Sequence, residues 1–151
     1  MEGKKYFTLA LDGKNKQKET ITSNPGHLLF TGILEKDKAD LVVKRLFEPD
    51  MWTPYGIRTQ STEELDFDYQ SKVLGSIWPH DNWIIAQGLK KLGYNNEYQK
   101  IKEAILKAHK EFGYIPELYA VTPEYKLEEI ERACNPQAWA SGAVLEFLKN
   151  N

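Results

Sequence analysis

Apolar and polar positions follow two kinds of helical pattern along the chain. Residues 36–48 and 97–112 carry apolar side chains at three- and four-residue steps with charged residues opposite, which predicts amphipathic helices. Residues 25–34, 81–92 and 136–148 are apolar or rich in small residues, which predicts more deeply buried helices.

Polar residues and prolines indicate where the buried helices begin. Asn-Pro pairs at 24–25 and 135–136 each place a capping residue before a proline, a favoured helix start. Asp81 is predicted to cap the third buried helix. The pattern over 113–134 is mixed, and a short helix is predicted in KLEEIERA, residues 126–133.

The remaining segments predict an arm and a long loop. YFTLALDG, residues 6–13, predicts a short strand or extended arm followed by a charged turn. Residues 49–76 hold prolines, glycines and acidic residues with weak periodicity. A connection of this length inside a domain is more often functional than not.

The alternation of buried and amphipathic helices predicts an all-α fold. In an α/α toroid, an inner ring of apolar helices is surrounded by an outer ring of amphipathic ones, and the inner helices start around one cavity. A plain helical bundle is the alternative, and the long polar loops disfavour it.

Composition narrows the functional classes. A chain of 151 residues suits one domain, 1–151, and 41% hydrophobic with 28% charged residues is ordinary for a soluble protein. A net charge of −2 argues against nucleic-acid binding. The single cysteine, Cys134, can form neither an internal disulfide nor a cysteine metal cage. The N-terminus lacks a long apolar run, so we expect a cytoplasmic protein without signal peptide or membrane span.

GSIWPHDNW, residues 75–83, holds the chemistry that suits a sugar. Two tryptophans offer flat apolar faces, and His80 and Asp81 offer hydrogen-bonding groups. Two other interpretations stay open. Asp81 can be a helix cap beside a loop histidine, or the pair can bind metal with His27, as in HD-type phosphohydrolases. No aspartate follows Asp81 to complete such a metal site, and we predict neither metal nor cofactor.

Carboxylates are the other candidates for chemistry. Glu117 lies between a proline and aromatic residues, where burial could perturb its pKa, although it could equally be an ordinary loop glutamate. Glycoside hydrolysis needs two carboxyl groups, and Asp81 and Glu117 could form such a pair. Cys134 has no histidine nearby in sequence and no GxSxG turn occurs, so nucleophilic catalysis is disfavoured.

Five motif segments resemble one family when taken in order. They are SNPGHLLFTGI (23–33), YGIRT (55–59), GSIWPHDN (75–82), IPELY (115–119) and CNPQAWASGA (134–143). Together they resemble the C-terminal part of bacterial and archaeal amylo-α-1,6-glucosidase, or glycogen-debranching-related, proteins. These belong to the (α/α)6-barrel glycosidases, and the resemblance runs from about residue 6 to residue 148.

The resemblance implies an α-glucosidase that inverts the anomeric carbon and acts on an α-glucan or oligosaccharide. Glu117 looks like the general base, with Asp81 as a weaker catalytic candidate. Sugar contacts are implied for the matching positions Trp78, His80, Asp81, Arg58, Gln137 and Trp139.

Two departures from the family pattern matter. Where relatives carry Tyr-His and then Asn, this chain has Lys72, Val73 and Leu74. The family's acid aspartate comes from an upstream segment, and twelve helices with loops need roughly 190 residues. We therefore expect a half-barrel that self-associates or binds a separate N-terminal half-barrel chain. A non-catalytic carbohydrate-binding or scaffold remnant is the alternative.

Overall fold

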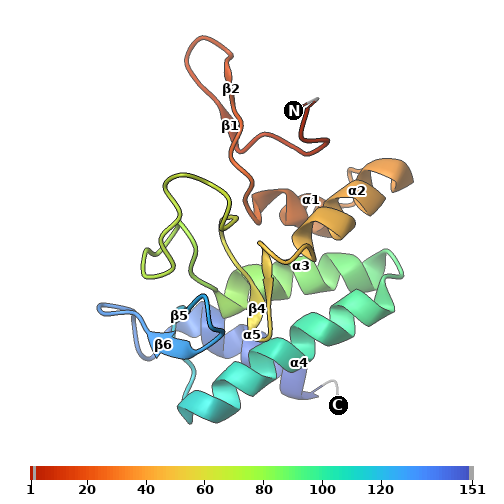
Figure 1. The fold of residues 1–151 in the computed structure, drawn as a ribbon. Coiled ribbons are helices and arrows are strands. Elements are labelled where there is room, and N and C mark those ends of the chain that lie inside the picture. The colour runs from red at the N-terminus through yellow and green to blue at the C-terminus, as the bar shows by residue number, and fades with distance from the viewer. Residues whose placement is uncertain (2, 150–151) are drawn as a thin grey trace.

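The computed structural model describes residues 1 and 3–149, which form a mostly helical chain with three small antiparallel hairpins (Figure 1). The helices are the 3₁₀ turn η1 (Asn24–Gly26), α1 (His27–Thr31), α2 (Lys36–Leu46), α3 (Pro79–Lys91), α4 (Asn95–Phe112) and α5 (Ala138–Lys149). The hairpins pair β1 (Ala10–Leu11) with β2 (Gln17–Lys18), β3 (Trp52–Thr53) with β4 (Gly56–Ile57), and β5 (Tyr119–Val121) with β6 (Leu127–Glu129). The predicted mostly helical architecture is confirmed, with the correction that these hairpins make the fold other than all-α, and the α/α toroid stays a prediction.

Helix α3 lies at the centre of the fold. It packs against α1, α4 and α5, and a short connection over 92–94 joins it to α4, which lies beside it (Figure 1). Gly88 permits the close crossing of α1, because a Cβ atom there would lie 2.4 Å from the backbone nitrogen of Phe30.

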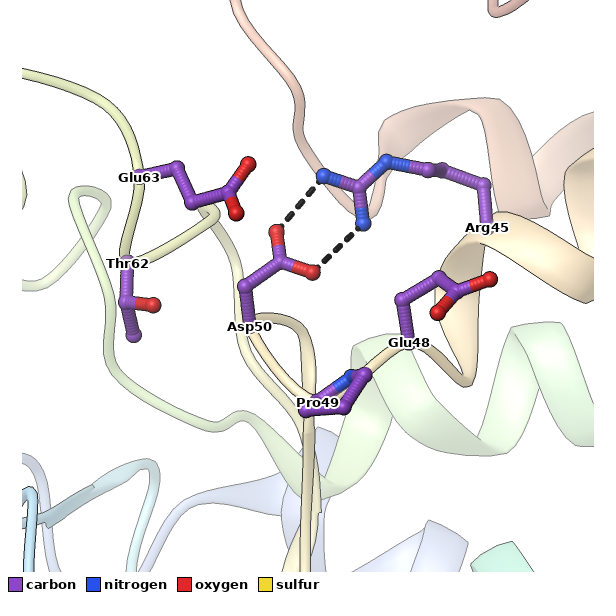
Figure 2. A pocket seen from close by; sticks show the side chains of 6 residues that line it. All are labelled: Arg45, Glu48, Pro49, Asp50, Thr62 and Glu63. Atoms are coloured by element: carbon purple, nitrogen blue, oxygen red, sulfur yellow. Dashed lines mark hydrogen bonds and ion pairs between the residues drawn. The ribbon is translucent and has the colours of Figure 1, made fainter.

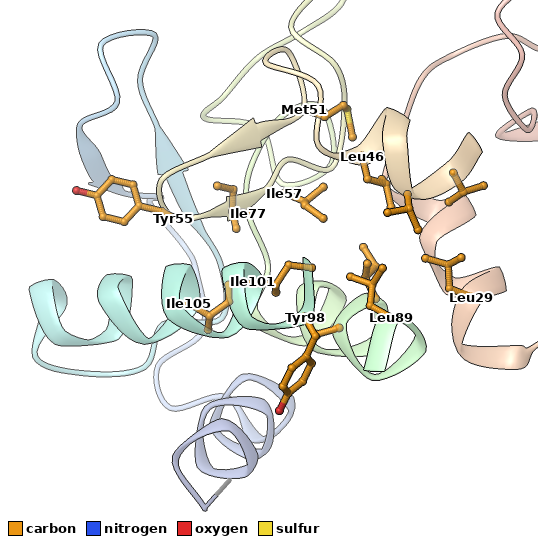
Figure 3. Close-up of a cluster of buried hydrophobic side chains, with 14 of the residues drawn as sticks. Leu29, Leu46, Met51, Tyr55, Ile57, Ile77, Leu89, Tyr98, Ile101 and Ile105 are labelled. Atoms are coloured by element: carbon orange, nitrogen blue, oxygen red, sulfur yellow. The ribbon is translucent and has the colours of Figure 1, made fainter. Parts of the chain in front are cut away.

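The core fills the space between α3, α4 and the β3–β4 hairpin (Figure 3). Its fully buried members share large aliphatic side chains from separate segments, among them Leu29, Leu46, Ile57, Ile77, Leu89 and Ile101. Burying each of these stabilises the fold by about 1.5–3 kcal/mol, before the loss of side-chain entropy is counted. The core therefore fixes the positions from which α3 and its preceding loop begin.

All three predicted helix starts are wrong. Helix α5 begins at Ala138, so the Asn135-Pro136 pair lies before the helix and Pro136 is not its first position. Asn24 lies inside η1, which has no side-chain cap, and the apolar run ends early because Gly32 adopts a left-handed conformation with φ 72°. Helix α3 begins at Pro79, the first helical position, so Asp81 lies in the first turn instead of capping it. Its carboxylate bonds to a side chain 54 residues away, which the local pattern cannot indicate.

The predicted helix over 126–133 is also wrong. Residues Leu127–Glu129 form β6, which pairs with β5 so that Val121 lies opposite Leu127. Tyr125 turns the chain with φ 61°, and Thr122 donates its backbone N–H to the carbonyl of Lys126. Pairing with the buried strand β5 outweighs the local helix propensity of this segment.

The share of buried residues is larger in α3 than in α5. Six of the 13 residues of α3 are buried, against six of 18 in α4, as the sequence predicts. In α5 only four of 12 are buried, the same share as in α4, so the prediction of a deeply buried helix is wrong there. Among residues 1 and 3–149, no helix has both the length and the apolar character needed to cross a lipid bilayer.

Candidate active site

The segment before α3 is fixed by pairing with the segment after Glu117. Ile77 and Tyr119 form an antiparallel bridge, with N–H to carbonyl distances of 2.8 and 3.0 Å. Trp78 packs against the cluster that contains Leu118, and its indole Nε1–H donates to the Lys72 carbonyl at 2.7 Å. This bridge brings two of the predicted sugar-site segments, GSIWPHDN and IPELY, side by side.

The Glu117 carboxylate is held by one oxygen. Its Oε2 accepts a hydrogen bond from the backbone N–H of Cys134 at 2.9 Å and one from Lys72 Nζ at 3.2 Å. The Cys134 carbonyl in turn accepts from the Glu117 N–H at 3.2 Å. The side chain is 12% exposed, and neither of these two bonds to the carboxylate uses Oε1. The Cys134 N–H, and then Lys72, lower the pKa of Glu117, so the carboxylate is ionised at neutral pH. The Cys134 thiol is a further, weaker influence that lowers the pKa of the carboxylate.

Asp81 is anchored by His27. The distance from His27 Nε2 to Asp81 Oδ1 is 2.6 Å, and this hydrogen bond raises the pKa of His27. The second oxygen, Asp81 Oδ2, is buried and has no hydrogen-bond partner among the described residues. A buried acceptor of this kind is normally satisfied by water or ligand.

His80 and Trp139 form the aromatic part of the site. Their ring centroids lie 5.0 Å apart with a 37° interplanar angle, and Trp139 is 61% exposed. Burial lowers the pKa of His80, which favours the neutral ring. Gln137 fixes the start of α5, because its Oε1 accepts the N–H of Ala140 at 2.7 Å.

Arg58 lies deeper than the other predicted site residues. It is 3% exposed, and its guanidinium donates to backbone carbonyls, including that of Val121 at 2.8 Å. Burial lowers its pKa to about 10, which leaves it charged at neutral pH. These contacts tie YGIRT to the β5 segment. A contact between Arg58 and sugar stays a prediction.

Asn82 is a site-building residue that the sequence reasoning missed. It is fully buried, its Oδ1 accepts the Ile57 N–H at 2.8 Å, and its Nδ2 donates to the carbonyls of Ile57 at 3.0 Å and Trp78 at 3.1 Å. The signal was available, because Asn82 shares the apolar face of α3 with Ile85 and Leu89. A polar residue on such a face must find partners.

The five motif segments thus meet around the start of α3. Residues 23–33 reach it through His27, 55–59 through Asn82, 115–119 through the Ile77 bridge and 134–143 through Trp139. The arrangement combines an ionised carboxylate, a flat exposed ring and a buried acceptor. Such groups can bind a sugar ring and accept a proton from water.

A family comparison agrees with this chemistry. Residues 14–144 match the mannosylglycerate hydrolase MGH1-like glycoside hydrolase domain. The chain belongs to this family. The comparisons support the glycosidase class that the motifs suggested, but not amylo-α-1,6-glucosidase in particular.

Individual relatives are distant and much longer than this MGH1-like chain. The mannosylglycerate hydrolase of Rubrobacter radiotolerans is 26% identical over 90 residues, which are 57% of this chain and 20% of that protein. The GH63 mannosylglycerate hydrolase of Thermus thermophilus, in complex with Tris and D-glycerate, superposes with a TM-score of 0.73 at 17% identity. Its complex with glucose gives 0.68 at 18%. These superpositions cover 91% of this chain but only about a third of theirs, so they show a shared fold over that part.

Two hollows of the MGH1-like chain matter here, one beside the candidate site and one away from it. One of about 390 Å³ is bordered by Pro116, Leu118 and Cys134, on either side of the Glu117 anchor. A larger one of about 580 Å³ is lined by charged residues, of which Arg45 donates to both oxygens of Asp50 at 2.8 and 2.6 Å (Figure 2). Because Arg45 and Asp50 already pair with each other and no motif segment lines this hollow, we do not place the sugar there.

Proposed function

We propose that this chain carries the base-bearing part of an inverting glycoside hydrolase. The observation behind the proposal is the Ile77–Tyr119 bridge, which sets Glu117 beside the segment of Trp78 and His80. The bonds that Glu117 accepts from Cys134 N–H and Lys72 both use Oε2. In the reaction, Glu117 Oε1 takes a proton from water as its oxygen bonds to the anomeric carbon. A carboxylic acid protonates the departing glycosidic oxygen, and the anomeric configuration inverts.

Sugar binding is assigned to the exposed and unpartnered groups near the start of α3. The exposed face of Trp139, held against His80, suits the C–H face of a pyranose ring. Asp81 Oδ2 is an acceptor for a sugar hydroxyl. Trp78 is assigned to the wall between these groups and the Glu117 loop. Its indole N–H is already bonded to the Lys72 carbonyl, so Trp78 offers its ring and no hydrogen-bond donor.

The substrate class follows from the relatives. Because those with a named activity are mannosylglycerate hydrolases, we propose a glycoside of a small polar acid, with mannosylglycerate as the first compound to test. The α-glucan suggested by the motif resemblance has no support from these comparisons, and maltose serves as its representative in the test.

The general acid and the remaining wall of the site are proposed to come from helices that complete a toroid. About two thirds of the fold of the Thermus relative has no counterpart in this chain. On α5, the neighbouring apolar side chains of Leu145 and Leu148 are 52% and 42% exposed. An apolar surface of this kind usually marks an interface. Either a second copy or a separate half-barrel chain could cover it.

Ligand binding can be tested on the chain itself. In a ¹⁵N-labelled sample, mannosylglycerate should shift the indole N–H resonances of Trp78 and Trp139, and maltose should shift them less. The Trp52 indole on β3 lies outside the motif segments and serves as the internal control. Trp139→Ala should weaken binding about tenfold or more, the effect of losing roughly 1.4 kcal/mol. Unchanged Trp78 and Trp139 resonances at millimolar ligand would contradict the proposed site.

The base role needs the complete fold. In an enzyme that includes the remaining helices, Glu117→Gln should lower kcat by about 10²–10⁴-fold while ligand binding persists. The anomer first released, read by proton NMR, should be inverted. Sugar binding without turnover in the complete fold would favour the carbohydrate-binding remnant instead.

A further inference from the structure

We propose that Lys72 is a positioning residue for the Glu117 carboxylate, which it holds by one oxygen through its side chain while its backbone carbonyl holds the Trp78 indole. This inference rests on the proposed function of Glu117 as a base. Lys72 itself touches no reacting atom in the scheme above.

The contacts of Lys72 join the two sides of the candidate site. Its Nζ donates to Glu117 Oε2 at 3.2 Å, and its carbonyl accepts from Trp78 Nε1 at 2.7 Å and from Ser76 Oγ at 2.6 Å. The residue belongs to the long loop before α3, whereas Glu117 follows α4, 45 residues further along the chain. One residue of the loop therefore sets both a wall of the site and its carboxylate.

Two donors on the same oxygen determine how the carboxylate is oriented. The Cys134 N–H and Lys72 Nζ both approach Oε2, so rotation about the final side-chain bond would break two hydrogen bonds together. Oε1 is left as the oxygen that can accept a proton. Without the ammonium group the Cys134 backbone N–H is the remaining donor to Oε2, and the plane of the carboxylate is held less firmly.

The electrostatic effect of Lys72 has the same direction. An ammonium group next to a carboxylate favours the ionised form, which a general base requires. The Lys72 side chain is 44% exposed, so solvent and salt screen the interaction.

The test is an NMR titration of the Glu117 side-chain carboxyl carbon, which needs no turnover. Lys72→Met should raise the pKa of Glu117 relative to the wild type, and Lys72→Arg should restore it, since arginine keeps the charge and the reach. Lys110→Met, at an exposed lysine of α4 outside the motif segments, removes the same charge and should leave the titration unchanged. Every variant retains the carbonyl at position 72, so the Trp78 indole resonance should stay in place and reports the loop.

The wild-type chain supplies a second measurement that needs no variant. Raising the salt concentration from about 10 mM to about 1 M shortens the screening length from about 30 Å to about 3 Å and should raise the pKa of Glu117. An unchanged titration in Lys72→Met, or an equal rise in Lys110→Met, would overturn the proposal. If Lys72→Met displaces the Trp78 resonance, the loop has moved, and the proposal is then tested by Lys72→Arg and by the salt series. A pKa of Glu117 that does not change with salt would then overturn the proposal. A chain that fails to bind sugar but passes this titration would refute the proposed function and leave the Lys72–Glu117 coupling standing.

Discussion

Replacing Asn82 with alanine should strongly destabilise the chain. Asn82 is fully buried at the start of α3 and carries no charge, so its effect comes from hydrogen bonding and packing alone. It also connects YGIRT to GSIWPHDN, since all three of its side-chain bonds go to the backbones of Ile57 and Trp78.

The expected magnitude follows from the groups left behind. In Asn82→Ala, the N–H and C=O of Ile57 lose their side-chain partners, whereas the Trp78 carbonyl keeps the backbone N–H of residue 82. At about 1–3 kcal/mol for each unsatisfied buried group, the loss is about 2–6 kcal/mol. That is a large share of the about 5–15 kcal/mol that stabilises a typical domain.

Urea unfolding, followed by circular dichroism and tryptophan fluorescence, measures the difference directly. Asn96→Ala is the matched control, because Asn96 is an exposed asparagine near the start of α4 and its loss should change the free energy of unfolding by at most about 0.5 kcal/mol. If Asn82→Ala unfolds within about 1 kcal/mol of the wild type, a value at the low end for even one unsatisfied group, the hydrogen bonds to Ile57 do not hold the site as described.

Two further predictions concern charge and surface. Because Asp81 raises the folded-state pKa of His27, the pair should stabilise the chain fully below about pH 6.5 and lose this contribution as the pH rises through the folded pKa. The difference in unfolding free energy between the wild type and His27→Gln should therefore shrink as the pH rises. It should stay under about 1 kcal/mol, since the His27 side chain is 40% exposed. A difference that grows with pH would contradict this sign. In light scattering, the isolated chain should have a mass above the 17.4 kDa of its monomer. Leu145→Glu on α5 should restore the monomer, whereas the control Leu41→Glu, at an exposed leucine of α2, should not. A wild-type chain that is already monomeric would argue against the α5 interface.

The sequence predicted those elements whose local pattern matches their surroundings. Helices α2 and α4 were placed to within two residues because their apolar faces meet the core and their charged faces meet water. The β5–β6 hairpin was missed because helical periodicity along a segment does not reveal pairing between two strands. Its segment, rich in Glu, Lys and Leu, has local helix propensity that only the pairing overrides.

In the candidate site, too, the order of the segments was predictable from the sequence and the contacts between distant residues were not. That the motif segments belong together was predictable from their order, and the His80–Trp139 contact fits that expectation. The individual contacts were not predictable, since Asp81 bonds to His27 across 54 residues and Glu117 to Lys72 across 45. Such pairs depend on how α1, α3 and the loop before α3 pack, and a single sequence does not contain that information in local form.

Some residues of the site hold its loops in place, and others have groups available to a ligand. Asn82 and Arg58 are almost fully buried. The Asn82 side chain bonds to backbone groups of Ile57 and Trp78, and the Arg58 guanidinium bonds to backbone carbonyls that include that of Val121, so both side chains hold loops in place. Glu117 Oε1 and the Trp139 ring face the opposite condition, since the bonds from the Cys134 N–H and Lys72 do not use Oε1 and the ring is exposed. Groups that a fold has fully satisfied gain nothing from a ligand, whereas unsatisfied groups do. The chemistry of this chain should therefore follow substitutions at Glu117 and Trp139, and its stability should follow those at Asn82 and Arg58.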